Sequence, residues 1–328
     1  MAKLLATEKE RYIQFKATSP YFSDPARVAG IYKKKPRPFC IPRDHAEENL
    51  FPEIRQTITP YFAEHEIKWH DGQDRRPSNH LCDSQVCGAN FLFPFADKPD
   101  DLTELLRPVF PDIRLALPIE GDHHVAFEWI GLENYLGEKM PRHRKRIRGA
   151  LFTSADAAVR FERQDGAVQV VLIEWKYTET YSSTSYKIAK SGTDRSKIYV
   201  HLYDRDDFPL KKELLPGFES LFYEPFYQLL RQQLLANEME KAGELGAGIV
   251  SLLHIAPACN PHFQRVTSPA LQELGDSVTG VWTDLQRRPD RFASISTEEL
   301  FNRYAGRRSP AMDAWWEYIT ARYSWILD

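Results

Sequence analysis

Residues 151–179 have the sequence LFTSADAAVRFERQDGAVQVVLIEWKYTE, and this stretch decides the fold that we expect. Two strand-like, largely apolar runs flank Gln164-Asp165-Gly166, and an Asp-Gly pair between such runs is typical of a β-hairpin. The hairpin can close in two ways, and the two registers place different side chains on each face of the sheet. The length of the loop therefore decides which polar residues meet.

The two registers differ in how well they separate apolar from charged side chains. A two-residue loop would pair Asp156 with Trp175 and would mix both kinds of side chain on both faces. A three-residue loop, with Gly166 in the left-handed conformation, would pair Ala157 with Ile173 and gather the apolar residues on one face. We therefore predict the three-residue loop.

This register places Asp156 directly opposite Glu174, with Lys176 one step further along the same face. Two opposed carboxylates repel each other, and a cation between them would relieve the repulsion. Two carboxylates, completed by water and phosphate oxygens, are how Mg²⁺ is usually held, and Mn²⁺ accepts similar ligands. Lys176 would then orient or deprotonate a water molecule, or stabilise charge on a phosphate. The alternative interpretation is a salt-bridge cluster on a solvated face.

Asp156 followed by Glu174-Trp175-Lys176 resembles the signature of the PD-(D/E)xK superfamily of restriction-endonuclease-like nucleases. The wider pattern, from RG through TSADA and IEWKYTE to YEPFYQLLRQQLLA, is similar to a prokaryotic branch of that superfamily and spans roughly residues 125–240. Ala155 stands where the motif has proline. The resemblance implies hydrolysis of DNA phosphodiesters with Mg²⁺ or Mn²⁺ held by Asp156 and Glu174, and with Lys176 as the catalytic lysine.

The same resemblance implies two further contributors to the site. An upstream helical glutamate often joins it, and Glu128 or Glu133 would serve here, with Glu128 preferred. Related nucleases also carry a glutamine on the helix that follows the E-x-K strand, and Gln228 occupies that segment. Gln228 or Arg231 would contact a phosphate or order the ammonium group of Lys176. The alternatives are a structural carboxylate for Glu128 and ordinary helix surface for the other two.

The order of the remaining patterns predicts an α/β fold, a restriction-endonuclease-like mixed β-sheet flanked by helices. We expect a single elaborated domain, with residues 1–120 as a helical and irregular N-terminal elaboration and 121–328 as the nuclease-like core with C-terminal helices. Within the elaboration, the prolines predict irregular structure over 1–45. The apolar spacing predicts a helix or helix pair over 44–66, interrupted at Pro52 and Pro60. The composition predicts mostly loop over 71–100. Later elements are expected as a short helix at 100–110, a long helix at 221–245, a buried strand at 249–255, a strand at 291–296, and helices at 269–287, 297–305 and 309–326.

Composition bounds the class of protein. The chain has 328 residues, 42% hydrophobic and 27% charged, with a formal charge of −3, which excludes collagen-like, disordered and disulfide-scaffold proteins. A protein that coats nucleic acid by charge alone usually runs basic. The first residues, MAKLLATEKERYIQFK, carry too many charges for a secretory signal, and no apolar run approaches the ~18 residues of a membrane span. With four scattered cysteines, we expect a cytoplasmic protein with no membrane contact.

Local basic patches would still allow contact with nucleic acid, which the resemblance implies to be DNA. One basic run, residues 141–148, precedes the hairpin, and a second basic group follows it in a segment rich in Ser and Thr. Either group would also be stable as plain solvated surface. A homodimer is the partner arrangement that we consider. The residues expected at nucleic acid are Arg144, Lys145, Arg146, Arg148, Lys187, Lys190 and Arg231, with Arg195 and Lys197 close in sequence.

Two other functions compete with a nuclease. A nucleic-acid-binding or assembly protein of the same fold would need little or no catalysis, although a protein released from catalysis would be free to lose Asp156, Glu174 or Lys176. A glycoside hydrolase would use Asp156 and Glu174 as its acid and base, but Lys176 would keep Glu174 ionised and hinder the acid role. DNA versus RNA and single versus double strand stay open at this point.

Overall fold

The computed structural model describes residues 4–72, 75–139, 145–149 and 152–327. Its centre is a mixed sheet of six strands in the order β3-β5-β6-β7-β8, with β4 paired to the same edge of β5 as β3. The β3, β4, β5 and β6 pairings are antiparallel, whereas β6, β7 and β8 run parallel. The predicted class, an α/β fold with a mixed sheet flanked by helices, is confirmed. The strands are β3 (Ile113–Leu117), β4 (Val125–Trp129), β5 (Ala155–Arg163), β6 (Val168–Trp175), β7 (Ile249–Ala256) and β8 (Phe292–Ser296), beside a small separate ribbon of β1 (Gly30–Tyr32) and β2 (Lys35–Arg37).

The β5–β6 hairpin has the predicted register. Ala157 pairs with Ile173 and Val159 with Val171, and Gly166 has a φ of 83° in the turn. Because successive side chains alternate between faces, this register sends the odd-numbered residues over 157–161 and 171–175 into one apolar cluster, and the even-numbered Ala158, Val170 and Leu172 into another. The hairpin therefore lies at the centre of the molecule, with apolar packing on both faces.

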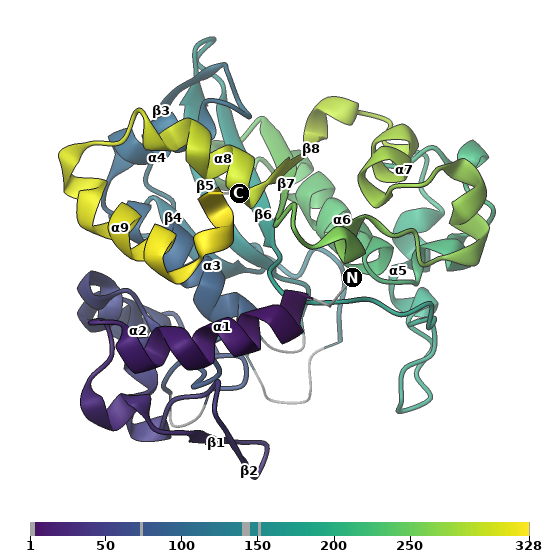
Figure 1. Cartoon of the computed structure of the whole chain (residues 1–328). Coiled ribbons are helices and arrows are strands. Elements are labelled where there is room, and N and C mark those ends of the chain that lie inside the picture. The colour runs from purple at the N-terminus through teal and green to yellow at the C-terminus, as the bar shows by residue number, and fades with distance from the viewer. Residues whose placement is uncertain (1–3, 73–74, 140–144, 150–151, 328) are drawn as a thin grey trace.

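Helices cover both faces of the sheet, as Figure 1 shows. One face packs against the N-terminal helices and against α8 and α9, and the other packs against α5, α6 and α7. Among the described helices, none combines the length and the apolar character that crossing a bilayer requires. The helices are α1 (Leu4–Thr18), α2 (Arg55–Glu64), α3 (Ser84–Leu92), α4 (Pro99–Leu106), α5 (Ser196–Tyr203), α6 (Phe226–Ala242), α7 (Val278–Leu285), α8 (Thr297–Ala305) and α9 (Asp313–Arg322), with short 3₁₀ turns between them.

The N-terminal part is more helical than its composition predicts. The prediction of irregular structure over 1–45 is wrong at α1, a helix that ends before Pro20, the first proline of the segment. The prediction of mostly loop over 71–100 is wrong at α3. The start of this helix is fixed by the Asp83 side chain, which accepts a 2.9 Å hydrogen bond from the Val86 N–H. Pro60 lies inside α2 and does not interrupt it, because Pro60 is exposed and removes only one backbone hydrogen bond.

The later elements follow the sequence pattern more closely. α8 and β7 occupy the expected segments, β8 falls within 291–296, and α6 lies within 221–245. α6 ends at Gly243, which has a φ of 61°, three residues before the expected stop at Gly246. The segment 269–287, predicted as one helix, forms a 3₁₀ turn followed by the shorter α7. The segment 309–326, also predicted as one helix, forms α9 with a 3₁₀ turn on either side. β3, β4 and α5 are absent from the prediction.

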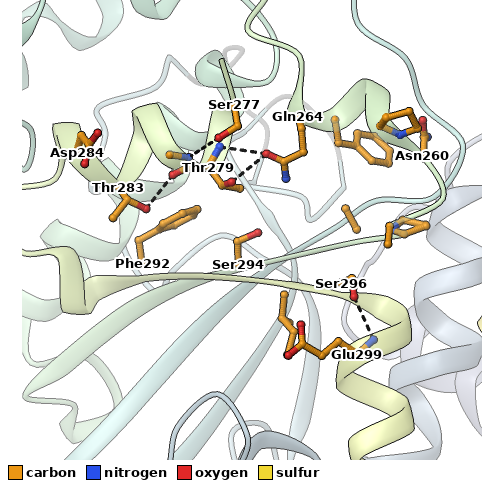
Figure 2. Close-up of a pocket in the computed structure, with 17 residues that line it drawn as sticks. Asn260, Gln264, Ser277, Thr279, Thr283, Asp284, Phe292, Ser294, Ser296 and Glu299 are labelled. Atoms are coloured by element: carbon orange, nitrogen blue, oxygen red, sulfur yellow. Dashed lines mark hydrogen bonds between the residues drawn. The ribbon is translucent and has the colours of Figure 1, made fainter. Parts of the chain in front are cut away.

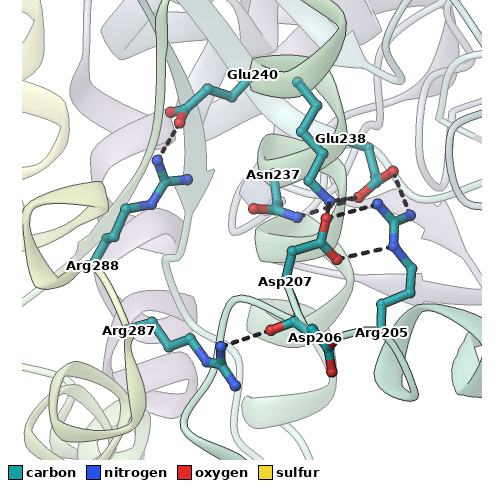
Figure 3. A network of polar contacts seen from close by, with 9 residues as sticks. Arg205, Asp206, Asp207, Asn237, Glu238, Glu240, Arg287 and Arg288 are labelled. Atoms are coloured by element: carbon teal, nitrogen blue, oxygen red, sulfur yellow. Dashed lines mark hydrogen bonds and ion pairs between the residues drawn. The ribbon is translucent and has the colours of Figure 1, made fainter.

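Ion pairs fix the C-terminal half of α6 to the loops that follow α5 and α7 (Figure 3). Arg205 contacts Asp207 at 2.9 Å and Glu238 of α6 at 3.0 Å, and Arg288 contacts Glu240. Partly exposed pairs of this kind contribute little stability each. Their effect is orientation, because they hold the helix whose other half carries Gln228.

The turn conformation of Gly166 generates a stability prediction. An added Cβ would touch nothing within 4 Å, so Gly166→Ala should cost only the left-handed backbone strain, about 1 kcal/mol of unfolding free energy. Gly306→Ala is the matched control, because Gly306 also has open space around it but a φ of −77°. Urea denaturation followed by tryptophan fluorescence measures both variants. Equal effects of the two substitutions would contradict the strained turn.

Candidate active site

Three acidic residues lie in a row across neighbouring strands at one end of the sheet. The β4–β5 register, continued through its gap, places Glu128 opposite Asp156, and the β5–β6 register, extended by one residue, places Asp156 opposite Glu174. At this position of the β5–β6 pairing, the Asp156 side chain takes the place of a backbone carbonyl, because its Oδ2 accepts a 2.7 Å hydrogen bond from the Trp175 N–H. Asp156 and Glu174 therefore lie near each other at the end of the hairpin, close enough for the charge of Glu174 to raise the pKa of Asp156 after burial has done so.

Lys176 and Glu174 form a buried ion pair at the end of β6. Their residues are 5% and 2% exposed, and the ammonium group of Lys176 contacts Oε1 of Glu174. The second oxygen of Glu174 accepts a hydrogen bond from Nε2 of Gln232 on α6, and the same Nε2 donates at 3.1 Å to the carbonyl of Ser154. The backbone N–H of Lys176 donates at 2.9 Å to the carbonyl of Ile255 on β7. β6, β7 and α6 thus hold this ion pair in place.

Burial and neighbouring charge shift the pKa values of this group. Burial, and then the charge of Glu174, raises the pKa of Asp156 well above its usual range. Burial alone would lower the pKa of Lys176, but the acidic groups around it, Glu174 first and then Tyr181, Asp156 and Glu179, together outweigh burial and the net shift is upward. Lys176 is therefore an ammonium ion at neutral pH.

Glu128 lies on β4 and not on a helix, so the expected helical glutamate is a strand residue. Its φ of 48° is left-handed, which interrupts the ladder opposite Asp156 and re-aims the carboxylate. That carboxylate accepts 2.8 Å hydrogen bonds from Gln85 and Ser154, and His70 Nε2 lies 3.6 Å from it. Burial raises the pKa of Glu128. Glu133, the other candidate, is exposed in the turn after β4.

A cavity of about 150 Å³ lies in front of Asp156 and Lys176. Gln228 lines it from α6, and its Oε1 accepts a 3.1 Å hydrogen bond from the hydroxyl of Tyr181. The first turn of α3 lines the opposite side. The expected catalytic residues Asp156, Lys176 and Gln228 therefore border one cavity, with Glu174 and Glu128 buried beside it; the other lining residues are His70, Ser84, Gln85, Gly88, Leu92, Phe127, Trp175 and Glu179.

The donor set fits Mg²⁺ better than a metal held wholly by protein. Within the described ranges, no three His, Cys, Asp or Glu side chains converge in a metal-holding arrangement. Asp156 and Glu174 supply two carboxylates, and Mg²⁺ typically keeps several waters and takes one or two carboxylates. Burial, and then the charge of Glu174, raises the pKa of Asp156, and a cation between the two carboxylates would relieve their repulsion.

The arginine side chains of the basic run before the hairpin mostly bind other groups of the protein. Arg144 lies outside the described residues, and Lys145 is exposed. Arg146 donates to the three carbonyl groups that follow β4. Arg148 forms a bidentate pair with Glu120 at 2.9 and 2.6 Å. These contacts give Arg146 and Arg148 a structural role that would compete with binding a phosphate.

The second basic group lies on the other side of α6. Lys187 pairs with Glu219 at 2.9 Å, and Lys190 is exposed in the loop before α5. Arg231 of α6 packs over the ring of Tyr227, with its guanidinium carbon 4.8 Å from the ring centre. Arg231 lines a cavity whose wall also includes Lys139 and Phe152, and Arg146 packs over the ring of Phe152, so this surface adjoins the run before the hairpin.

A larger cavity of about 680 Å³, shown in Figure 2, lies at the carboxyl ends of β7 and β8. Hydroxyl groups at the starts of α7 and α8 line it, including Ser277 and Ser296. None of the residues expected from the sequence to form the active site lines this cavity. Cavity size alone would therefore point away from the carboxylates.

Sequence reasoning missed several residues that hold the site together. Gln232 contacts Glu174, and its signal was available, because it lies four residues after Gln228 on the same face of one helix. Gln85 and His70 reach Glu128 from segments more than forty residues upstream, and no local pattern connects them.

Because Lys176 and Glu174 form a buried ion pair, we expect substitutions of these two residues to have strongly coupled effects on the free energy of unfolding. Lys176→Met should lower the free energy of unfolding by about 3–5 kcal/mol, because it leaves Glu174 charged and buried. Glu174→Gln should also destabilise the protein, whereas the double variant should regain most of the loss, since no lone charge remains. Urea denaturation in EDTA measures all four proteins. Losses that simply add in the double variant would show that the two side chains do not interact.

Comparison with known proteins agrees with this geometry. The chain matches the family model described as Restriction Endonuclease associating with ARP over residues 11–324. Neither the curated proteins nor the solved structures gave a match. Membership of a restriction-endonuclease family implies a nuclease that acts on DNA, and the family resemblance inferred from the hairpin is confirmed. The chain therefore belongs to the family of restriction endonucleases described as associating with ARP.

Proposed function

We propose that the protein is a Mg²⁺-dependent DNA endonuclease, with Mn²⁺ as an alternative ion, and that Asp156 and Glu174 hold the ion. The observation that carries this proposal is the contact between buried Glu174 and Lys176 beside Asp156, at the border of a cavity. Two carboxylates and an amine at this spacing suit hydrolysis of a phosphodiester, because the developing charge is negative and needs positive partners.

The bound ion would supply Lewis acidity and a lowered pKa for the attacking water. Asp156 would orient the ion through the oxygen that does not bind the Trp175 N–H. Because the pKa of Lys176 is raised, its ammonium group would orient the water and stabilise charge on the phosphate rather than remove a proton. Gln232 would hold Glu174 in place through its hydrogen bond from α6.

Glu128 and Gln228 would act at the margin of this site. Glu128 is hydrogen-bonded by two neutral donors, Gln85 and Ser154, and would accept a hydrogen bond from a water in the cavity. Gln228 lines the cavity from α6, so its amide would contact a substrate phosphate.

The competing functions fit these contacts less well. A glycoside hydrolase needs one carboxyl group as a proton donor, whereas both oxygens of Glu174 are already engaged, one by the ammonium group of Lys176 and the other by the amide of Gln232. A protein that only binds DNA would gain nothing from a buried charge pair whose desolvation is costly.

Cleavage of supercoiled plasmid and of single-stranded DNA with Mg²⁺ or Mn²⁺ tests the proposal. Asp156→Asn and Glu174→Gln keep the size of each side chain and should each reduce cleavage about 100-fold or more, and EDTA should abolish it. Glu162→Gln is the matched control, because Glu162 lies on the same hairpin in an exposed pair with Arg114. Its activity should equal that of the wild type.

A second readout separates loss of the ion from loss of the fold. Calorimetric titration with Mn²⁺ should show weaker binding by Asp156→Asn and unchanged binding by Glu162→Gln, while circular dichroism stays the same for both. Cleavage that survives in Asp156→Asn and Glu174→Gln would assign the activity to a contaminant and overturn the proposed site.

A further inference from the structure

A large cavity lined by charged residues lies beside α5 and α6, and the chemistry above does not use it. Its volume is about 970 Å³, at the upper end of the ~300–1,000 Å³ range of small-molecule sites. It combines aromatic rings with basic side chains, chiefly Tyr186, Tyr199, Tyr227, Arg195, Lys197 and Arg231. Such a combination is how proteins bind the bases and phosphates of single strands.

The basic groups of this cavity lack acidic partners among the described residues. Arg195, Lys197 and Arg231 form no ion pair there, and Nε of Arg231 is buried without a hydrogen bond. Three acidic side chains also line the cavity and accept hydrogen bonds from neutral donors: Glu138 from Thr153 and Tyr199, Asp194 from Ser196, and Glu224 from the N–H of Gln228. The four basic side chains of the lining, Lys139, Arg195, Lys197 and Arg231, outnumber them, so an anionic group would complement the cavity.

Two tyrosine rings form a platform next to these cations. Tyr186 and Tyr227 are stacked, with ring centres 6.3 Å apart and planes inclined by 18°, and Tyr186 is 37% exposed. The guanidinium carbon of Arg195 lies 5.8 Å from both ring centres. Backbone pairing of Tyr186 with Phe222 fixes the outer ring, so its exposed face is a pre-organised surface for stacking a base.

This cavity adjoins the candidate active site through α6 and the residue that precedes it. Glu224 lines the cavity and accepts a 3.3 Å hydrogen bond from the N–H of Gln228, which lines the active-site cavity. Arg231 is the neighbour of Gln232, which holds Glu174. The two cavities therefore adjoin through the hydrogen bond between Glu224 and Gln228, and a strand bound at one would continue toward the other.

We propose that this cavity receives one unstacked nucleotide of the DNA strand, with its phosphate on Arg231 and its base against Tyr186. The inference rests on the proposed function and extends it, because it names the substrate class as DNA with an unpaired nucleotide beside the cleaved phosphate. A base inside an intact duplex is stacked on both faces, so it reaches such a platform only after leaving the helix.

Binding of 2-aminopurine oligonucleotides in EDTA tests this inference without cleavage. A single strand, or a duplex with one unpaired 2-aminopurine, should bind at least tenfold more tightly than a fully paired duplex, and its fluorescence should be quenched by stacking on tyrosine. Tyr186→Leu should remove the quenching and weaken binding about tenfold. Arg231→Gln should weaken binding of the same oligonucleotides and reduce its salt dependence.

Arg303→Gln is the control, because Arg303 is an exposed arginine on α8 and its loss removes one charge elsewhere. Tyr186 lies at the surface, so Tyr186→Leu should fold even if Arg231→Gln does not. Equal affinity for paired and unpaired DNA, or quenching that persists in Tyr186→Leu, would overturn the inference while leaving cleavage intact. Preferential binding without any cleavage would instead overturn the proposed function alone.

Discussion

The alignment of β5 against β6 is the constraint on which the candidate site depends. Side chains alternate between the faces of a strand, so a slip of one residue would turn Glu174 and Lys176 toward the opposite, apolar face. There the pair would lie among aromatic rings, far from Asp156. The three-residue turn at Gly166 fixes the alignment from one end, and the parallel pairing of β6 with β7 fixes it from the other. Folding and chemistry thus depend on one register.

Buried charge in this protein lies in two places that differ in their neighbours. Arg322 is 0% exposed, and its terminal nitrogens donate to neutral backbone and side-chain oxygens, while its Nε is buried without a partner. At the end of the hairpin, by contrast, the pKa of Asp156 is raised by burial and by the neighbouring carboxylate of Glu174. Carboxylates held side by side cost stability, and groups with shifted pKa values concentrate where a protein carries out chemistry.

The sequence predicts those features that local pattern determines. The hairpin register follows from one turn and the alternation of side chains, and β7 and α8 follow from short, clear periodicity. α1 was missed because the prolines after it dominated the composition of the segment. β4 was missed because it is a short, fully buried strand, and its Glu128 has a left-handed backbone that no propensity encodes. The contacts of Gln85 with Glu128 arise only when α3 packs against the sheet.

The positive charge that remains unpaired favours, for DNA, the surface beside α6 over the run before β5. The run before β5 is the more basic segment in sequence, yet Arg146 and Arg148 are already bound by carbonyl groups and by Glu120. A phosphate there would have to displace those partners at a cost comparable to the gain. Beside α6, Arg231 binds no acid among the residues that the structure describes, and it lies one residue from Gln232. The surface that we propose for DNA therefore depends on the charge that remains after internal pairing, which the net charge of a sequence segment does not show.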